Sequence, residues 1–256
     1  MTIHDAASKG FSTQSGTYER GRPEYPAALG GWLERELGVR PGTRVADIGA
    51  GTGKFTRLLA QTGASVVAVE PVDAMRDRLT HALGDVSALA GTAEAIPLED
   101  ASLDAVCCAQ AFHWFANDDA LREFHRVLRL DGRLGLVWNV RGESVDWVAA
   151  ITRIITPYEG DAPRFHTGRW RVPFEGQRLF TEPRCTAFTH GHVGDFEQVV
   201  MDRFMSVSFI AALPDADKQQ VASQLRALPD AFPILRQPTI EFPYRTEAWL
   251  SERIGR

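Results

Sequence analysis

A glycine-rich turn near the start of the chain is the segment best suited to binding a ligand. The run VADIGAGTGKF places glycines at positions 49, 51 and 53, directly after an apolar stretch that contains Asp47. Glycine lets the backbone approach a ligand closely and adopts positive φ without strain. Asp47 can accept hydrogen bonds from a cationic amine or from the amides of the turn itself. These residues predict a small-molecule site, with nucleotides as the first candidates.

Two common nucleotide motifs fit this turn poorly. A phosphate-binding P-loop ends in Gly-Lys-Ser/Thr, but Gly53-Lys54 is followed by Phe55, and Ile48 stands where the first glycine is required. The dinucleotide motif needs a glycine where Lys54 stands, since a bulky side chain there impedes packing of the helix on the strand. ATP is therefore disfavoured, and NAD is disfavoured but stays open.

A carboxylate follows at the expected distance. Glu70 ends the next apolar run, VVAVEP. An acidic residue about 20 positions beyond the first glycine is placed to hold the hydroxyls of a ribose. The segment therefore has a ribose partner but no pyrophosphate cradle. A nucleoside without phosphates fits this description, and S-adenosylmethionine is the common one.

The elements that position these residues alternate between strand and helix. The predicted strands cover 43–48, 65–70, 86–90, 103–109 and 133–140, and the predicted helices cover 26–37, 54–61, 74–82 and 118–128. Short apolar strands separated by helices are typical of a parallel sheet covered on both faces. We expect an open, doubly wound α/β fold, whose ligand lies beyond the carboxyl ends of the strands.

The second half of the chain has a weaker pattern. It predicts helices over 145–155, 196–210 and 215–228, strands over 186–192 and 239–244, and irregular backbone over 164–182. The sheet is then mostly parallel and seven-stranded, with a helical and irregular lid. We expect one domain over 1–256, made of an N-terminal cap (1–40), a cofactor-binding core (41–140), a variable substrate-covering region (141–238) and a closing strand with a tail (239–256).

Several segments resemble the class I S-adenosylmethionine-dependent methyltransferases, in the group that contains the trans-aconitate methyltransferases. These segments are VADIGAGTGKFT, VEPVDAM, GTAEAIPLEDASLDAVCCAQAFHWF and VLRLDGRLGLVWN, with YERGRPEYP and FPYRTEAWL nearer the ends. The resemblance is highly specific over 40–140 and much weaker over 141–235. It implies a Rossmann-like methyltransferase fold and an enzyme whose cofactor is S-adenosyl-L-methionine.

The resemblance also implies a role for each matching residue. The turn would pass under the amino-acid part of the cofactor, with Asp47 near its amine, and Glu70 would take the ribose hydroxyls. Thr92 would face adenine; related sequences often carry aspartate there, but a threonine hydroxyl can still accept the bond from the exocyclic amine. The full set of cofactor residues is Tyr18, Arg22, Asp47, Gly49, Ala50, Gly51, Gly53, Glu70, Pro71, Thr92, Ala93, Gln110 and Ala111.

His113, in AQAFHWF, is the candidate catalytic residue, since the resemblance places it at the methyl end of the cofactor. Its ordinary pKa suits a general base near neutral pH. A structural role, in which the ring orients the loop through a hydrogen bond, is the favoured alternative. A carboxylate acceptor needs no base, whereas a hydroxyl usually does.

The composition narrows the class of acceptor. The formal net charge is −5 at pH 7, and no basic patch is present, so nucleic acid is disfavoured. The exit of the fourth strand lacks the Asn/Asp-Pro-Pro-aromatic signature of enzymes that methylate exocyclic or amide nitrogen. We expect a small-molecule acceptor methylated at a carboxylate or hydroxyl oxygen. An NAD-dependent oxidoreductase and a non-catalytic S-adenosylmethionine-binding protein are the alternatives.

The variable region holds polar and aromatic residues whose role the pattern leaves open. They are His166, Arg169, Trp170, Arg171, His190, His192 and Arg203. Arginines there can clamp a carboxylate through paired hydrogen bonds, although scattered arginines are more often solvated surface. His190 and His192 would share one face of a strand, but no cysteine or carboxylate cluster accompanies them, so we expect no metal.

The remaining expectations concern location and assembly. No apolar run is long enough to cross a bilayer, and the first residues lack an apolar core of signal-peptide length. Cys107, Cys108 and Cys185 follow no ligand spacing, so we expect all three to be buried small hydrophobes. These features predict a cytoplasmic protein without a membrane partner, as a monomer or a homodimer.

Overall fold

The computed structural model of the protein describes residues 21–255, which fall into two compact units. The larger unit comprises Tyr25–Asn139, Pro163–Phe188 and residues 246–255, and the smaller unit comprises residues 21–24, Val140–Ala162 and Thr189–Arg245. Each unit is described by itself below. The expected single domain and its lid therefore stay predictions.

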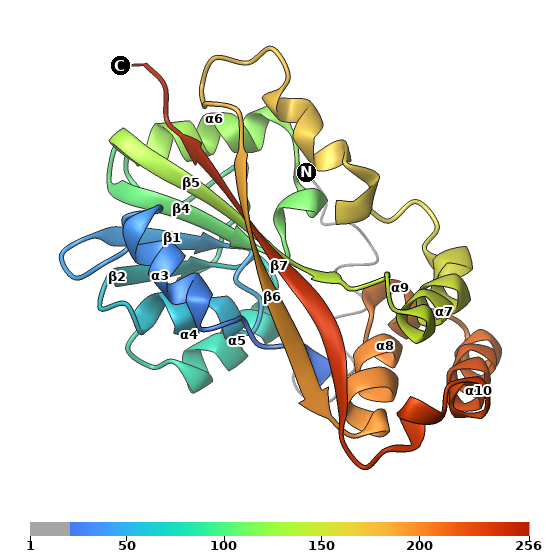
Figure 1. The fold of residues 1–256 in the computed structure, drawn as a ribbon. Helices are drawn as coiled ribbons and strands as arrows, with labels where there is room; N and C mark the ends of the chain where they lie inside the picture. Colours follow the sequence, from blue (N-terminus) through green and yellow to red (C-terminus); the bar gives the residue numbers. More distant parts are fainter. Residues whose placement is uncertain (1–20, 256) are drawn as a thin grey trace. The chain divides into compact units, whose positions relative to one another are not determined.

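The larger unit is organised around parallel strands in the order β3-β2-β1-β4-β5. They are β1 (Arg44–Ile48), β2 (Ser65–Val69), β3 (Ser87–Leu89), β4 (Leu103–Ala109) and β5 (Leu128–Arg141), and Figure 1 shows them side by side. The register between β1 and β2 runs from Arg44 opposite Ser65 to Ile48 opposite Val69. The carboxyl ends of β1 and β2, where Glu70 follows directly, therefore lie at the same edge of the sheet.

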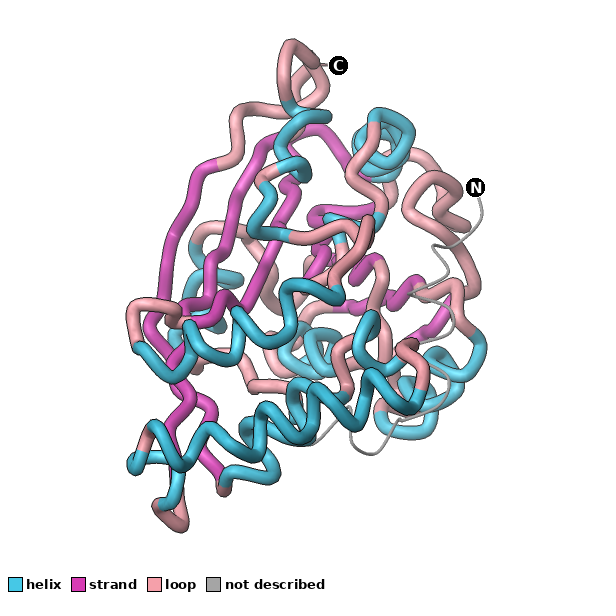
Figure 2. The backbone as a smooth tube through the Cα atoms, turned by 90° about the vertical axis from the view of Figure 1, so that its right-hand side faces the viewer, coloured by secondary structure: helices cyan, strands magenta, loops and turns pink. Residues whose placement is uncertain are grey.

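Helices connect these strands, as the apolar periodicity predicts. They are α3 (Ala28–Arg35), α4 (Lys54–Ala60), α5 (Asp73–Ala82) and α6 (Asp118–Val127), and Figure 2 shows how the backbone alternates between strand and helix. Trp32 of α3 and Phe55 of α4 pack in one hydrophobic cluster with Val45 of β1 and Cys107 of β4. Buried apolar side chains thus hold the helices on the sheet and fix where the strand ends point.

The closing strand β7 (Ile240–Glu252) is longer than the sequence predicts and runs antiparallel to β5. In the smaller unit Gly142 N donates to Pro243 O, and in the larger unit Arg253 N donates to Gly132 O, both at 2.9 Å. The predicted end at 244 is wrong because the continuation carries polar residues on its buried face. Thr246, for example, is fully buried and its hydroxyl donates to Asn139 Oδ1 at 2.6 Å.

In the sheet, β7 follows β5, and β6 (Arg184–Gly194) follows β7 as the edge strand. The seven strands confirm the predicted mixed α/β fold with most strands parallel. Cys185 of β6 is exposed, whereas Cys107 and Cys108 are buried. The prediction of a buried Cys185 is wrong because the outer half of this strand leaves its side chains uncovered.

The smaller unit holds mainly helices around a second hydrophobic cluster. They are α7 (Asp146–Ile155), α8 (Arg203–Met205), α9 (Ser208–Ala211) and α10 (Asp215–Ala231), with a π-helical turn over Glu197–Asp202 (Figure 1). The single helix predicted over 196–210 is wrong, since the backbone there divides into three short pieces. Val199, Val200 and Phe204 from these pieces are buried in the cluster, together with Ile151 of α7 and Phe242 of β7.

None of the helices among residues 21–255 is long and apolar enough to cross a membrane.

Candidate cofactor site

The glycine turn between β1 and α4 adopts a conformation that requires glycine. Gly49, Gly51 and Gly53 have φ values of 70°, 58° and 87°. A side chain at such angles costs about 1–2 kcal/mol per residue. Gly53 directly precedes α4, so this left-handed turn joins the strand to the start of the helix.

The three glycines do not serve the same purpose. A Cβ atom on Gly49 would lie 2.8 Å from the Cβ of Ala111, so this glycine is required by packing inside the protein. A Cβ on Gly51 would meet nothing nearer than Met75 Sδ at 4.0 Å. The face of Gly51 is therefore open, and it is the part of the turn that a ligand can approach.

Glu70 follows β2 and is tied to the turn by its side chain. Its Oε2 accepts a hydrogen bond from Gly51 N at 2.8 Å, and its Oε1 accepts one from Val72 N at 2.9 Å. Burial raises the pKa of this carboxyl, and the two backbone hydrogen bonds act in the opposite direction. Each carboxylate oxygen retains a second lone pair, so the group can still accept hydrogen bonds from a ligand's hydroxyls.

Asp47 lies at the end of β1 with one carboxyl oxygen lacking a partner. Thr56 Oγ1 donates to its Oδ2 at 2.6 Å, whereas Oδ1 is buried without a hydrogen bond. Burial raises the pKa of Asp47 to about 7; the Thr56 hydrogen bond lowers it, and the charge of Glu70 raises it. A buried acceptor without a donor is costly, so Oδ1 suits a cationic donor supplied by a ligand.

Of the two partners that the sequence suggests for Asp47, the amides of the turn do not bond to it. The amide of Gly51 donates to Glu70 instead, and Asp47 takes the hydroxyl of Thr56 from α4. Neither Thr56 nor the Val72 amide was singled out from the sequence. The partner of a buried carboxylate depends on how the helix packs on the strand, and no local pattern at Thr56 signals that contact.

The segment after β3 carries Thr92 and Ala93 in a tight turn. Thr92 and Ala95 form an isolated antiparallel bridge, and Ala93 is buried. The side chain of Asn117, which caps the start of α6, donates to Glu94 Oε1 at 3.0 Å. This turn is thereby linked to α6, which follows β4.

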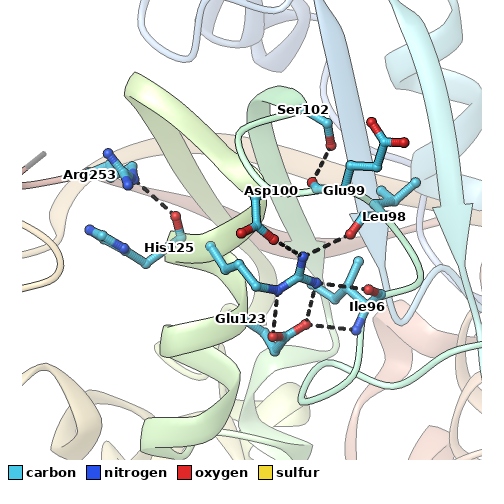
Figure 3. Close-up of polar contacts among 9 residues, drawn as sticks. Ile96, Leu98, Glu99, Asp100, Ser102, Glu123, His125 and Arg253 are labelled. Atoms are coloured by element: carbon cyan, nitrogen blue, oxygen red, sulfur yellow. Dashed lines mark hydrogen bonds and ion pairs between the residues drawn. The ribbon is translucent and has the colours of Figure 1, made fainter.

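Arg126 of α6 fixes the chain immediately beyond this turn, and Figure 3 labels its partners Ile96, Leu98, Asp100 and Glu123. Its guanidinium donates to the carbonyl oxygens of Ile96 and Leu98 at 3.0 and 2.9 Å, and to Asp100 Oδ1 at 2.7 Å. Glu123 accepts two further bonds from Arg126 and one from Ile96 N. The hydrogen bonds from Arg126 lower the pKa of Glu123. The chain that follows the predicted adenine-facing turn is thus held by an Arg126–Glu123 ion pair, which no local sequence pattern signals.

The exit of β4 places Gln110 and Ala111 in a constrained backbone. Gln110 has a φ of 57°, which is uncommon for a residue other than glycine, and its amide donates to Val137 O at 2.8 Å. Ala111 is buried against Gly49. Strained backbone of this kind is concentrated at functional sites. In the larger unit, the exit of β4 therefore contacts the glycine turn.

His113 is held by an aromatic neighbour from β5. The indole Nε1 of Trp138 donates to His113 Nδ1 at 3.1 Å. Since an indole nitrogen is only a donor, Nδ1 is the acceptor, and the neutral ring carries its proton on Nε2. Trp138 is itself buried and packs on Phe165 and Trp170, with ring centroids 4.7 and 4.8 Å away.

Two predicted residues are not brought to this site by the described structure. Tyr18 lies outside the described residues, and Arg22 belongs to the smaller unit. Among residues 21–255, no three histidine, cysteine or acidic side chains gather in a way that could hold a metal ion. The larger unit alone brings together the remaining candidates around the glycine turn.

A family model described as a methyltransferase domain matches residues 46–136, which begin one residue before Asp47 and end within β5. An uncharacterized methyltransferase-like protein of Schizosaccharomyces pombe is 38% identical over 249 residues, which cover 96% of each chain.

Solved structures share the fold. One from Anaeromyxobacter dehalogenans, named only provisionally as a type II methyltransferase, has a TM-score of 0.62 and 25% identity, over 92% of this chain and 97% of that chain. Phosphoethanolamine N-methyltransferase 2 of Haemonchus contortus, solved with S-adenosylhomocysteine, has a TM-score of 0.58 and 12% identity, over 100% of this chain and 61% of its own.

Proposed function

Because the chain belongs to the S-adenosylmethionine-dependent methyltransferases, we propose that it methylates a small organic molecule at a carboxylate or hydroxyl oxygen. The proposed cofactor binding rests on Asp47, whose buried Oδ1 has no hydrogen-bond partner. This oxygen belongs to the strand that leads into the glycine turn, whose Gly51 is open to a ligand. The group of the trans-aconitate methyltransferases is the subgroup we propose, on the sequence segments described above.

The residues of the larger unit fit the chemical groups of this cofactor. Asp47 Oδ1 would accept a hydrogen bond from the cofactor's ammonium group, and the open face of Gly51 would admit its amino-acid portion. Glu70, held rigidly by two backbone amides, would accept the ribose hydroxyls. The Thr92–Ala93 turn would face adenine. Gln110 and Ala111 would line the methionyl portion.

When bound, S-adenosylmethionine supplies a methyl group activated by its positive sulfur. The protein has to align an acceptor oxygen with the bond that breaks and to exclude water. Alignment of this kind can account for about 7–11 kcal/mol of a reaction barrier. Trp138 next to His113 is buried, and it packs on the buried Trp170 and the half-buried Phe165, which provides an apolar environment of the kind that excludes water.

His113 acts on this account by position rather than as a base. Its Nδ1 lone pair accepts the Trp138 hydrogen bond, so taking up a proton there would break that contact. Its Nε2 carries a proton and can donate to an acceptor oxygen or to the loop. A carboxylate acceptor, which needs no base, agrees best with this arrangement.

A screen of small metabolites tests the proposed function. The protein is incubated with S-adenosylmethionine and pools of organic acids, alcohols and amines, and release of S-adenosylhomocysteine is measured. The account predicts turnover with an acid or alcohol. Binding of the cofactor without turnover in any pool would favour the non-catalytic alternative, and binding of NAD in its place would favour the oxidoreductase. Nucleic acid is not expected as a substrate.

The cellular setting is part of the same proposal. We propose a cytoplasmic enzyme that acts without a membrane partner and without a metal, as a monomer or a homodimer. The acidic charge balance and the lack of a long apolar run in the sequence support the proposal that the enzyme acts without a membrane partner. Gel filtration at several protein concentrations tests the oligomeric state.

A further inference from the structure

In the smaller unit, Arg203 is a half-buried cation whose hydrogen bonds are incomplete. Its Nε donates to the hydroxyl of Tyr244 at 3.2 Å, whereas its Nη1 is buried with no hydrogen-bond partner. A guanidinium carries five N–H donors, and burying one unpaired is costly. Such a group is expected where a ligand completes the set of partners.

Arg203 and a second arginine, Arg141, both lie against the ring of Phe204. The guanidinium carbon of Arg203 is 5.4 Å from the centroid of Phe204, and that of Arg141 is 5.8 Å from it. Burial lowers the pKa of Arg141, and the charge of Arg203 lowers it further. Two cations therefore influence each other in a largely buried environment.

The acidic groups near Arg141 compensate this charge only in part. Its Nε lies 3.5 Å from Glu143 Oε1, but the Glu143 side chain is 48% exposed and also accepts from Thr152 Oγ1 at 2.9 Å. The charge of Glu159 raises the pKa of Arg141 and so opposes the effect of burial. An exposed, shared carboxylate is a weak counter-ion for a buried arginine.

Two further polar groups lie beside Arg203. Tyr244 is buried, and because its hydroxyl accepts from Arg203, its own proton is available to donate. The ring of His190 lies 6.0 Å from that of Tyr244, but it donates to the backbone of Glu24, and burial lowers its pKa, so the buried Nε2 of the neutral ring is an acceptor. The donors beside this cluster are therefore the guanidinium of Arg203 and the hydroxyl of Tyr244.

We propose that Arg141, Arg203 and Tyr244, here called the arginine site, bind the oxyanion of a small molecule, a carboxylate or a phosphate. The planar guanidinium pairs with two oxygens at once, which suits both groups. That the bound molecule is the methyl acceptor rests on the proposed function. That the arginine site binds an anion is independent of the proposed function.

Titration calorimetry at constant ionic strength tests the arginine site. Sodium malonate and inorganic phosphate are the two anionic probes, and malonamide is the uncharged control. Arg203→Gln and Tyr244→Phe are compared with the wild type. Arg153→Gln, which changes an exposed arginine of α7 in the same unit, is the matched control variant. Thermal unfolding and titration with S-adenosylhomocysteine check that each variant is folded.

We expect one anion to bind the wild type and malonamide not to bind. Affinity should fall about tenfold or more in Arg203→Gln, less in Tyr244→Phe and not at all in Arg153→Gln. The tighter of malonate and phosphate identifies the group. Equal heats for wild type and a folded Arg203→Gln would overturn the arginine site and leave the proposed function standing. Anion binding that Arg203→Gln weakens, without methyl transfer to any acid, would support the arginine site and contradict methylation of a carboxylate.

Discussion

The glycine turn of the larger unit and the arginine site of the smaller unit are built in different ways. The turn takes its ligand groups from a segment of the chain between Asp47 and Glu70, and much of it is backbone. The arginine site takes side chains from three separate segments, with Arg141 on β5, Arg203 on α8 and Tyr244 on β7. A local pattern can therefore reveal the first, whereas only tertiary structure assembles the second.

This difference has a physical consequence for how each region tolerates change. A turn with positive φ angles depends on the backbone, so substitution there strains the fold itself. Arg203 makes a side-chain hydrogen bond to Tyr244 and leaves its buried Nη1 unpaired, so its substitution should affect binding more than stability. The first three predictions below examine the turn and its surroundings, in order of decreasing effect on stability.

Gly49→Ala should be the most damaging change. The positive φ costs about 1–2 kcal/mol and the overlap with Ala111 about 1–3 kcal/mol, so the free energy of unfolding should fall by about 2–5 kcal/mol. Gly51→Ala is the matched control, with a positive φ but open space, and should cost only about 1–2 kcal/mol. Urea unfolding of both variants measures this. Equal losses would mean that the packing of Gly49 on Ala111 is unimportant.

The second prediction concerns Asp47 and pH. Its pKa is raised to about 7 from 3.8, so the folded protein holds a proton that the unfolded chain loses between these values. Stability should therefore decrease as pH rises from about 4 to 7, by an amount on the order of 3–4 kcal/mol, and Asp47→Asn should remove this dependence. Urea unfolding from pH 4 to 8 measures it. Identical pH profiles for wild type and Asp47→Asn would contradict the raised pKa.

The third prediction concerns the contact between His113 and Trp138. Trp138→Phe removes one hydrogen bond and should lower the free energy of unfolding by about 0.5–1.5 kcal/mol from that loss. Once an acceptor is known, His113→Ala should lower turnover less than tenfold, since its ring positions the loop. A loss of about 10²–10⁴ with unchanged cofactor affinity would instead identify His113 as a general base.

Much of the fold of the larger unit follows from the sequence, because its strands and helices are short and regularly spaced. Short apolar runs indicated β1, β2 and β4 within a residue or two of their bounds. The spacing between the first glycine and Glu70 indicated a ribose-binding carboxylate. Both signals are local, so neither requires knowledge of how distant segments pack.

The remainder depends on contacts between segments far apart in the chain. The end of β7 was missed because Thr246 and Ser251 are polar but buried, bonded to Asn139 and Thr181 respectively. The break between Glu197–Asp202 and α9 has no glycine or proline to announce it. Arg203 is one of the variable-region arginines that the sequence offered as carboxylate clamps, but only the structure shows its bond to Tyr244 and its buried, unpartnered Nη1.

The central claim is that the turn with Glu70 binds S-adenosylmethionine, and calorimetric titration of Glu70→Ala tests it most directly. The variant loses two hydrogen bonds to a charged group, each worth about 1.5–3 kcal/mol, so affinity for S-adenosylhomocysteine should fall at least about tenfold. Asp73→Ala, which removes a nearby exposed carboxylate, should leave the affinity unchanged. The account also predicts no binding of NAD or ATP to the wild type. Unchanged affinity in a folded Glu70→Ala protein would contradict the claim.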